Sequence, residues 1–184
     1  MLVDEIRKCK VLIIGAGTAG LTCASTLINK GEKDILIYTK GYGASPEIAG
    51  INFLTEDTEE EQKLYYEDMM QVGYHINNSS LVKNMVKNSN QTLKFLIDID
   101  VEFTKESNGK FKKRHLSGHS TPRTLCNVNQ FIGESILKTE QNYLKENDIK
   151  INLGYECFHL REEGLKKVAY FVKNGKITEI NTDI

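Results

Sequence analysis

The sequence predicts an α/β fold with a parallel sheet, a helical insertion and a C-terminal β-meander. Three observations support this prediction. The N-terminal part contains a short apolar run, a glycine-rich loop and a helical stripe of apolar residues in direct succession. Helix-like and strand-like segments then follow one another through the middle of the chain. Near the C-terminus, two strand-like segments flank Asn174-Gly175, which is the strongest short signal for a β-hairpin.

The first elements form a β-α-β unit of about 30 residues, the start of a Rossmann-like fold. Residues 10–14 are predicted as a strand, because Val11 to Ile14 form a continuous apolar run that is typical of a strand buried on both faces. A helix follows over residues 19–30 and ends at Gly31, and residues 34–38 are the next strand. The apolar side chains of this helix share one face: Leu21, Ala24, Leu27 and Ile28.

The middle of the chain reads as a helical insertion over about residues 58–98. A polar helix over residues 58–71 begins at the capping residue Thr58 and carries acidic residues in its first turn. Residues 77–80 signal the start of a second helix. Its apolar residues recur at spacings of three and four: Leu81, Val82, Met85, Val86, Leu93, Leu96 and Ile97.

The last elements return to strand character. We expect a short strand at residues 101–103, a helix over residues 130–145 and a strand at residues 149–153. The predicted hairpin pairs residues 167–172 with residues 176–180. The helix turns four apolar residues inward: Ile132, Ile136, Leu137 and Leu144.

Composition narrows the class of protein. A chain of 184 residues can bury a real core, and its formal net charge of −1 gives no reason to expect a nucleic-acid partner. No apolar run approaches the roughly 20 residues that a membrane span needs, and the charged N-terminus argues against a secretory signal. We therefore expect a cytoplasmic protein.

The cysteines argue against a metal site. They are widely spaced and form no C-x-x-C pair, so the sequence predicts neither zinc nor a redox dithiol: Cys9, Cys23, Cys126 and Cys157. We expect Cys9 and Cys23, which flank the glycine loop, to be buried small apolar groups.

The glycine loop predicts a dinucleotide site. The pattern G-x-G-x-x-G allows a tight turn, close approach of a pyrophosphate and close packing of helix on strand. The pyrophosphate then lies at the positive end of the helix dipole. The alternative is a tight turn without a ligand. The predicted binding residues of the loop are Gly15, Ala16, Gly17, Thr18, Ala19 and Gly20.

The second strand leaves the kind of nucleotide open. An acidic residue about 20 residues beyond the loop normally holds the ribose hydroxyls, but this strand ends in Thr39-Lys40. Lys40 could pair with the 2′-phosphate of NADP. Alternatively, Thr39 and backbone groups could hold the ribose of a flavin dinucleotide. A third interpretation is that Lys40 is simply a solvated charge.

Four segments resemble, in order and spacing, the flavoprotein family of L-aspartate oxidase and the fumarate reductase/succinate dehydrogenase flavoprotein subunits. They are "VLIIGAGTAGL", "ILIYTKGYGASPEIAGINFL", "LYYEDMMQVGYHINNSSLVKNMV" and "RHLSGHSTPRTL". The family's small hydroxyl residue followed by Lys appears here as Thr39-Lys40, and its D-x-x-x-x-G helix runs from Asp68 to Gly73. Its G-H-S-x-x-R segment is found at residues 118–123. Residues 1–184 then form a single, incomplete FAD-binding domain.

The resemblance implies FAD as the cofactor and adds site residues. Small residues after the second strand would approach the flavin, and Ile51 would follow them in the site: Gly43, Ala44, Ser45, Ala49 and Gly50. A second segment would lie near the flavin and substrate cleft, where a cation could stabilise reduced flavin or a dicarboxylate: His119, Ser120 and Arg123. Members with covalent flavin have a His in the loop after the second strand. This chain has none there, so we expect non-covalent FAD.

The implied activity is hydride transfer between flavin and a small acid substrate. Leu116 stands where aspartate-oxidising members often carry an acid. The family's catalytic Arg and substrate-binding His lie beyond the matching part, so no catalytic residue is assigned. We expect a truncated enzyme, or one whose cap and C-terminal segment come from a second polypeptide. The alternatives are a non-catalytic flavin- or nucleotide-binding protein, or an NADP-dependent reductase that uses Lys40.

Overall fold

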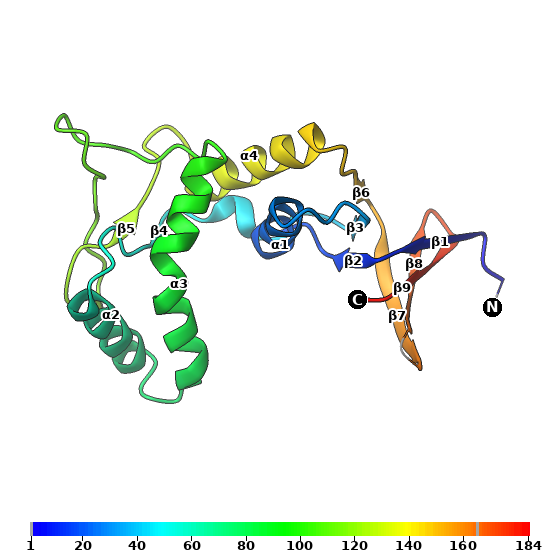
Figure 1. The fold of residues 1–184 in the computed structure, drawn as a ribbon, viewed down its shortest axis with the longest axis horizontal. Coiled ribbons are helices and arrows are strands. Elements are labelled where there is room, and N and C mark those ends of the chain that lie inside the picture. The colour runs from blue at the N-terminus through cyan, green and yellow to red at the C-terminus, as the bar shows by residue number, and fades with distance from the viewer. Residues whose placement is uncertain (1, 165) are drawn as a thin grey trace. The chain divides into compact units, whose positions relative to one another are not determined.

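The computed structural model describes residues 2–164 and 166–184. The chain forms two compact units (Figure 1). Unit 1 comprises Met1–Pro46 and Leu137–Ile184, and unit 2 comprises Glu47–Ile136.

Unit 1 contains the predicted β-α-β start. Strands β2 (Val11–Ile14), β3 (Ile35–Thr39) and β6 (Ile151–Leu153) form a three-stranded parallel sheet in the order β2-β3-β6. Helix α1 (Thr18–Asn29) connects β2 to β3. Helix α4 (Ile132–Glu146) precedes β6 in the chain. The predicted α/β class and its parallel sheet are confirmed.

A second sheet of unit 1 holds the predicted β-meander. Strands β7 (Glu156–Glu163), β8 (Lys166–Lys173) and β9 (Lys176–Thr182) pair antiparallel in chain order. The turn between β8 and β9 places Asn174 at φ 51° and Gly175 at φ 76°, the left-handed conformation that an Asn-Gly hairpin turn requires. The predicted hairpin is therefore confirmed.

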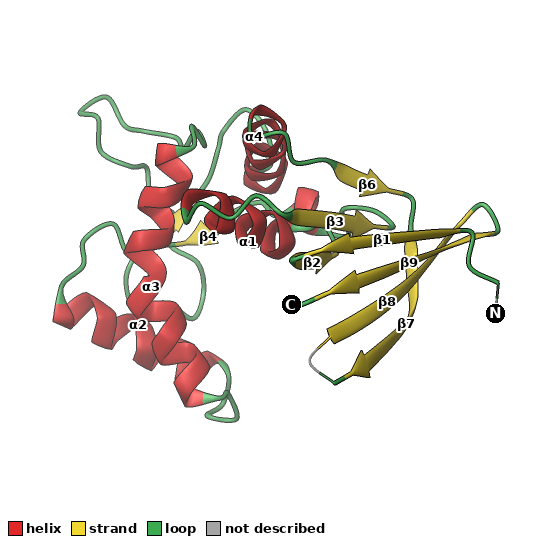
Figure 2. Cartoon of the chain, turned by 45° about the vertical axis from the view of Figure 1, so that its right-hand side comes forward, coloured by secondary structure: helices red, strands yellow, loops and turns green. Residues whose placement is uncertain are grey.

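Strand β1 (Glu5–Cys9) was not predicted. It pairs parallel with β9 and completes a four-stranded sheet in the order β1-β9-β8-β7 (Figure 2). Its one strongly apolar side chain, Ile6, is 62% exposed, while Cys9 is buried. The strand therefore lacks the apolar pattern that would reveal it.

Two groups of buried side chains stabilise unit 1. One joins β2, α1, β3 and α4, and it includes Leu21, Ile37 and Leu144. The other joins the two sheets, where the ring of Tyr38 lies 4.9 Å from that of Phe171. The predicted inward residues of α4 are all buried: Ile132, Ile136, Leu137 and Leu144. The prediction that Cys23 is buried was wrong, because this face of α1 is open and the thiol is exposed.

Unit 2 is built on helices α2 (Glu59–Val72) and α3 (Ser79–Asp98). Helix α2 starts at the predicted cap, where the Thr58 hydroxyl accepts a hydrogen bond from the Glu61 amide. Helix α3 starts within the predicted signal at residues 77–80, where the Asn78 side chain accepts two hydrogen bonds from the first turn. The predicted helical insertion lies within this unit. None of the helices in the described part of the chain is long and apolar enough to cross a membrane.

The strand predicted at residues 101–103 is absent. Val101 and Phe103 are buried, which explains their strand-like alternation, but the Val101 amide bonds to the Leu96 carbonyl and closes the end of α3. The short antiparallel pair of unit 2 is instead β4 (Ile51–Asn52) with β5 (Thr124–Leu125).

Candidate functional site

The glycine loop has the geometry of a dinucleotide-binding turn. Gly15 has φ +106°, a conformation that a residue with a side chain adopts only under strain. A Cβ atom at Gly20 would lie 2.0 Å from the Gly15 carbonyl oxygen and 3.3 Å from Ile13 Cγ2. The first glycine therefore permits the turn, and the third permits α1 to pack closely on β2.

The N-terminus of α1 presents donors that the protein itself does not use. No partner is found, among the described residues, for the amides of Gly17, Ala19 and Gly20. The cap residue Gly17 has no side chain to accept them, and the first turn of α1 contains no acidic residue. The hydroxyl of Thr18 is also buried without a partner. Unpaired donors at the positive end of a helix fit an anionic pyrophosphate.

Thr39 holds the glycine loop in place through its buried hydroxyl. Its hydroxyl accepts a hydrogen bond from the Ala16 amide at 3.1 Å and donates one to the Gly41 carbonyl at 2.6 Å. The residue is only 3% exposed. The Thr39 hydroxyl thus ties the glycine loop to the segment after β3, and its contact with a ribose stays a prediction.

Lys40 lies at the mouth of a cavity at the carboxyl ends of β2 and β3. Its ammonium pairs with the Glu156 carboxylate at 2.9 Å. The cavity has a volume of about 530 Å³, and its lining includes Gly15, Thr39, Lys40, Gly41 and Glu156. No sequence pattern predicts Glu156 at this place, because it is 116 positions from Lys40 in the chain.

The small-residue loop divides between the two units. In unit 1, Ala44 is exposed, while the Ser45 hydroxyl accepts a hydrogen bond from the Thr18 amide at 3.1 Å. In unit 2, Ala49 is exposed and Ile51 pairs with Leu125 between β4 and β5. A Cβ at Gly50 would meet Thr124 Cγ2 at 2.6 Å, so packing on β5 already explains that glycine. Ser45 is the member of this set that contacts the glycine loop and its helix.

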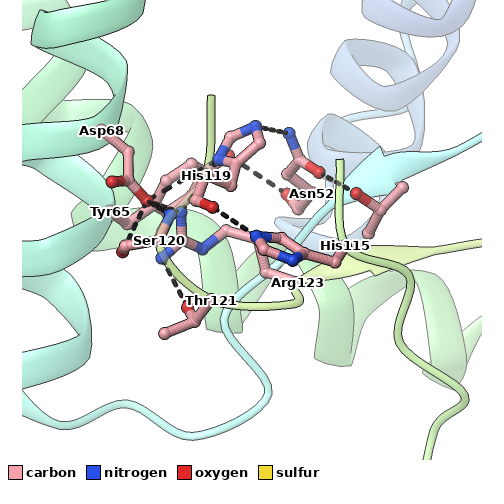
Figure 3. Close-up of polar contacts among 9 residues, drawn as sticks. Asn52, Tyr65, Asp68, His115, His119, Ser120, Thr121 and Arg123 are labelled. Carbon is pink, nitrogen blue, oxygen red and sulfur yellow. Dashed lines mark hydrogen bonds and ion pairs between the residues drawn. The ribbon is translucent and has the colours of Figure 1, made fainter. Parts of the chain in front are cut away.

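In unit 2 the G-H-S-x-x-R segment forms a polar cluster around the buried Asp68 (Figure 3). Asp68 accepts hydrogen bonds from the Ser120 amide at 2.9 Å, the Ser120 hydroxyl at 3.0 Å and the Arg123 guanidinium. The guanidinium also donates to the Thr121 hydroxyl at 2.8 Å and lies over the ring of Tyr65, 4.6 Å from its centroid.

This geometry does not support the prediction that Arg123 offers a cation to a flavin or a substrate. Arg123 is 3% exposed, and Asp68 neutralises its charge. Ser120 likewise directs both its amide and its hydroxyl to Asp68. The signal in the sequence that could have pointed to this ion pair is the D-x-x-x-x-G motif, because its first residue is Asp68. In unit 2 these residues hold the loop to α2.

The pKa of His119 lies below its ordinary value. Burial and the positive charge of Arg123 lower the pKa of His119, and the nearby Asp68 carboxylate only partly opposes them. The Arg123 guanidinium lies 2.9 Å from His119 Nδ1 and can only donate, so Nδ1 accepts and carries no proton. Nε2 lies 3.1 Å from the side-chain nitrogen of Asn52.

Glu140 is an unexpected buried acid in unit 1. It is fully buried on α4, its Oε1 accepts a hydrogen bond from the Thr22 hydroxyl of α1 at 2.5 Å, and its Oε2 has no partner among the described residues. Burial raises the pKa of Glu140 to about 7, against the opposing effect of the Thr22 hydrogen bond.

We expect Glu140 to make unit 1 less stable as the pH rises. Between pH 4.5 and 7 the folded chain keeps a proton that the unfolded chain has released, so the free energy of unfolding should fall by about 1.4 kcal/mol per pH unit. The total loss is about 3 kcal/mol, complete above pH 7. Glu140→Gln should remove this dependence in urea unfolding from pH 4 to 8, whereas Glu134→Gln, exposed on the same helix, should keep it. Parallel pH curves for wild type and Glu140→Gln would contradict the assignment.

The fold and the glycine loop define a dinucleotide-binding α/β protein of the Rossmann type. The chain belongs to the FAD binding domain family, which matches residues 10–183. Its cofactor is therefore FAD, and the interpretation of Lys40 as a binder of NADP is not retained.

Relatives of known function share this domain. L-aspartate oxidase of Clostridium acetobutylicum is 27% identical over 169 residues, which cover 91% of this chain and 39% of that protein. One polypeptide of the fumarate reductase (CoM/CoB) of Methanothermobacter marburgensis is 27% identical over 128 residues, or 66% of this chain and 23% of that polypeptide. The chain thus spans well under half the length of these relatives.

Solved structures show the same fold. The Sdh1 complex of Mycobacterium smegmatis in its apo form contains a chain that matches 97% of this one with a TM-score of 0.85 and 20% identity. FrdA of E. coli quinol fumarate reductase matches 97% with a TM-score of 0.84 and 16% identity. This chain covers 34% and 32% of those two chains.

Proposed function

We propose that this chain is the FAD-binding part of a flavoprotein oxidoreductase that transfers hydride between a small carboxylic acid and the flavin. The observation that carries the proposal is the N-terminus of α1, where unpaired amides follow a glycine loop in a family that binds FAD. The substrate class rests on the relatives, which are named for aspartate, fumarate and acrylate. All three compounds are small carboxylic acids.

Each residue set of unit 1 has a distinct task in holding FAD. The amides of Gly17, Ala19 and Gly20 would bind the pyrophosphate, with the helix dipole adding to the attraction. Thr39 and Ser45 keep the loop and the first turn of α1 in place. The cavity beside Lys40 would receive the adenosine end. When bound, the flavin ring supplies the two-electron chemistry.

The substrate-binding groups belong to a different part of the enzyme. In unit 2, the cation of the polar cluster is committed to Asp68, so it does not provide a clamp for a carboxylate. We assign no catalytic residue in this chain. The substrate clamp is expected in the part of the relatives that this chain does not match, on the same or a second polypeptide.

A flavin-binding protein without turnover is the second candidate. It is favoured by the neutralised Arg123 and by Leu116, an exposed apolar residue two positions before the G-H-S segment. Anaerobic mixing of the reduced, FAD-loaded chain with fumarate tests whether this chain turns over a substrate by itself, which neither candidate expects. Reoxidation at about 1–10³ per second, the usual range of enzymes, would assign turnover to this chain itself.

The first test of the proposal is the cofactor. The purified chain should show a flavin absorption spectrum or take up FAD in calorimetric titration, and NADPH should not bind. Residues 41–52 contain no histidine, so acid precipitation should leave the yellow colour in the supernatant. Binding of NADPH without FAD would refute the proposed function. Flavin fluorescence in the denatured protein band would refute the non-covalent attachment.

A further inference from the structure

The ribose end of the candidate site lacks its usual acid. Dinucleotide-binding folds of this kind generally hold the ribose hydroxyls with an Asp or Glu at the end of the second strand. Here β3 ends in Thr39-Lys40. The Thr39 hydroxyl already bonds to the Ala16 amide and the Gly41 carbonyl. Thr39 is only 3% exposed and the Lys40 ammonium can only donate, so neither side chain offers a ribose hydroxyl an exposed acceptor.

The fold brings an acid to this place from β7. The amides of Gly154 and Tyr155 both donate to the Thr39 carbonyl, at 2.8 and 3.0 Å. These two bonds hold the start of β7 against the end of β3. Glu156 therefore reaches Lys40, with Oε2 2.9 Å from Nζ, and both side chains line the 530 Å³ cavity that also includes Gly15. Glu156 is the acidic residue among those that line it.

We propose that Glu156 is the ribose-binding acid of this site. Its carboxylate accepts a hydrogen bond from the adenosine ribose of FAD, while Lys40 holds it in position. The inference rests on the proposed function, since it needs FAD at the end of β3. The pair of Glu156 and Lys40 would also select against nucleotides that carry a 2′-phosphate. The Glu156 carboxylate would repel the phosphate, and Lys40 is already paired with Glu156.

The ion pair between Glu156 and Lys40 is not needed to stabilise the fold. The Glu156 and Lys40 side chains are 57% and 74% exposed. Ion pairs between such exposed groups contribute little to folding, so the loss of this pair should leave the unfolding midpoint nearly unchanged. Any large effect of a Glu156 substitution must then appear in ligand binding.

The test compares three adenosine probes by calorimetric titration: ADP, 2′-deoxy-ADP and 2′,5′-ADP. Wild type should bind ADP about tenfold more tightly than 2′-deoxy-ADP, the effect of one hydrogen bond to a charged acceptor. Glu156→Gln should lose most of this preference, bind FAD about tenfold more weakly, and bind 2′,5′-ADP better because Lys40 is released. Glu162→Gln, exposed on the same strand outside this cavity, should behave as wild type.

Two failures are distinguishable. If wild type binds FAD and ADP but Glu156→Gln keeps the full preference for ADP over 2′-deoxy-ADP, Glu156 is not the ribose-binding acid. If wild type binds neither FAD nor ADP, the proposed function falls and the inference falls with it. Lys40→Met gives a further check: it should not gain 2′,5′-ADP binding, since the carboxylate remains. A gain in Lys40→Met equal to that of Glu156→Gln would overturn the selectivity argument.

Discussion

Replacing Asp68 with Ala should lower the free energy of unfolding of unit 2 by about 3–5 kcal/mol, the usual cost of removing one partner of a buried ion pair. Arg123 is 3% exposed and would be left as a buried cation without its carboxylate. The Ser120 amide and hydroxyl would lose their acceptor in the same step. Denaturant unfolding, followed by circular dichroism, measures the effect.

Two controls separate the buried pair from ordinary helix effects. Glu67→Ala removes a neighbouring exposed acid of α2, whose ion-pair distance to Lys63 is 3.9 Å, and should cost under about 1 kcal/mol. Ser120→Ala removes one hydroxyl donor to Asp68 and should cost about 1 kcal/mol. An Asp68→Ala loss no larger than that of Glu67→Ala would show that Asp68 does not stabilise Arg123.

The same pair has a defined pH dependence. Burial pushes the pKa of Asp68 up, but hydrogen bonds from Arg123 and Ser120 outweigh it and leave the pKa below its ordinary value of 3.8. A carboxyl with a lowered folded pKa stabilises the fold above its unfolded pKa, and this contribution is lost as the pH falls through the folded value. The contribution of Asp68 is therefore complete at neutral pH and is lost as the pH falls below 3.8, opposite in sign to that of Glu140.

Local patterns predicted much of this fold. Thr58 and Asn78 mark the starts of α2 and α3 because their side chains can accept the first free amides of a helix. Asn174-Gly175 marks the hairpin because both positions need positive φ. These signals depend on neighbours in the chain, so the sequence contains them in full.

Long-range partners were not predictable in the same way. In the sequence, the residues of β1 look like a charged surface segment. Their partner is β9, which begins at Lys176 near the other end of the chain, so no local pattern indicates the pairing. In the sequence, Glu156 cannot be distinguished from the other acidic residues. In the structure, the two amides that donate to the Thr39 carbonyl bring Glu156 beside Lys40. The sequence indicated that Arg123 matters, but its role depends on Asp68, 55 positions away in the chain. In each case the sequence shows the residue or segment itself, but not the distant partner that determines its role.

Replacing Gly17 with Val should reduce FAD affinity by at least about 100-fold. Gly17 caps α1, and its amide lies among the unpaired donors that we assign to the pyrophosphate. A Cβ there would already lie 3.0 Å from Ser45 Oγ and 3.5 Å from the Tyr42 carbonyl oxygen, so the branched side chain of Val would crowd Ser45, which holds the first turn of α1. Loss of two charge-assisted hydrogen bonds, each worth roughly 1.5–3 kcal/mol, accounts for a decrease of this size.

The folded state should survive Gly17→Val, because Ser45 is partly exposed and can move. Gly31→Ala is the matched control at the other end of the same helix. Its φ of +86° makes any side chain costly, by about 1–2 kcal/mol, but it should leave FAD affinity unchanged. Calorimetric titration with FAD and thermal unfolding of both variants give the comparison. If Gly17→Val lowered the melting temperature and kept wild-type FAD affinity, the pyrophosphate could not lie at the N-terminus of α1, and the glycine loop would be only a tight turn between β2 and its helix.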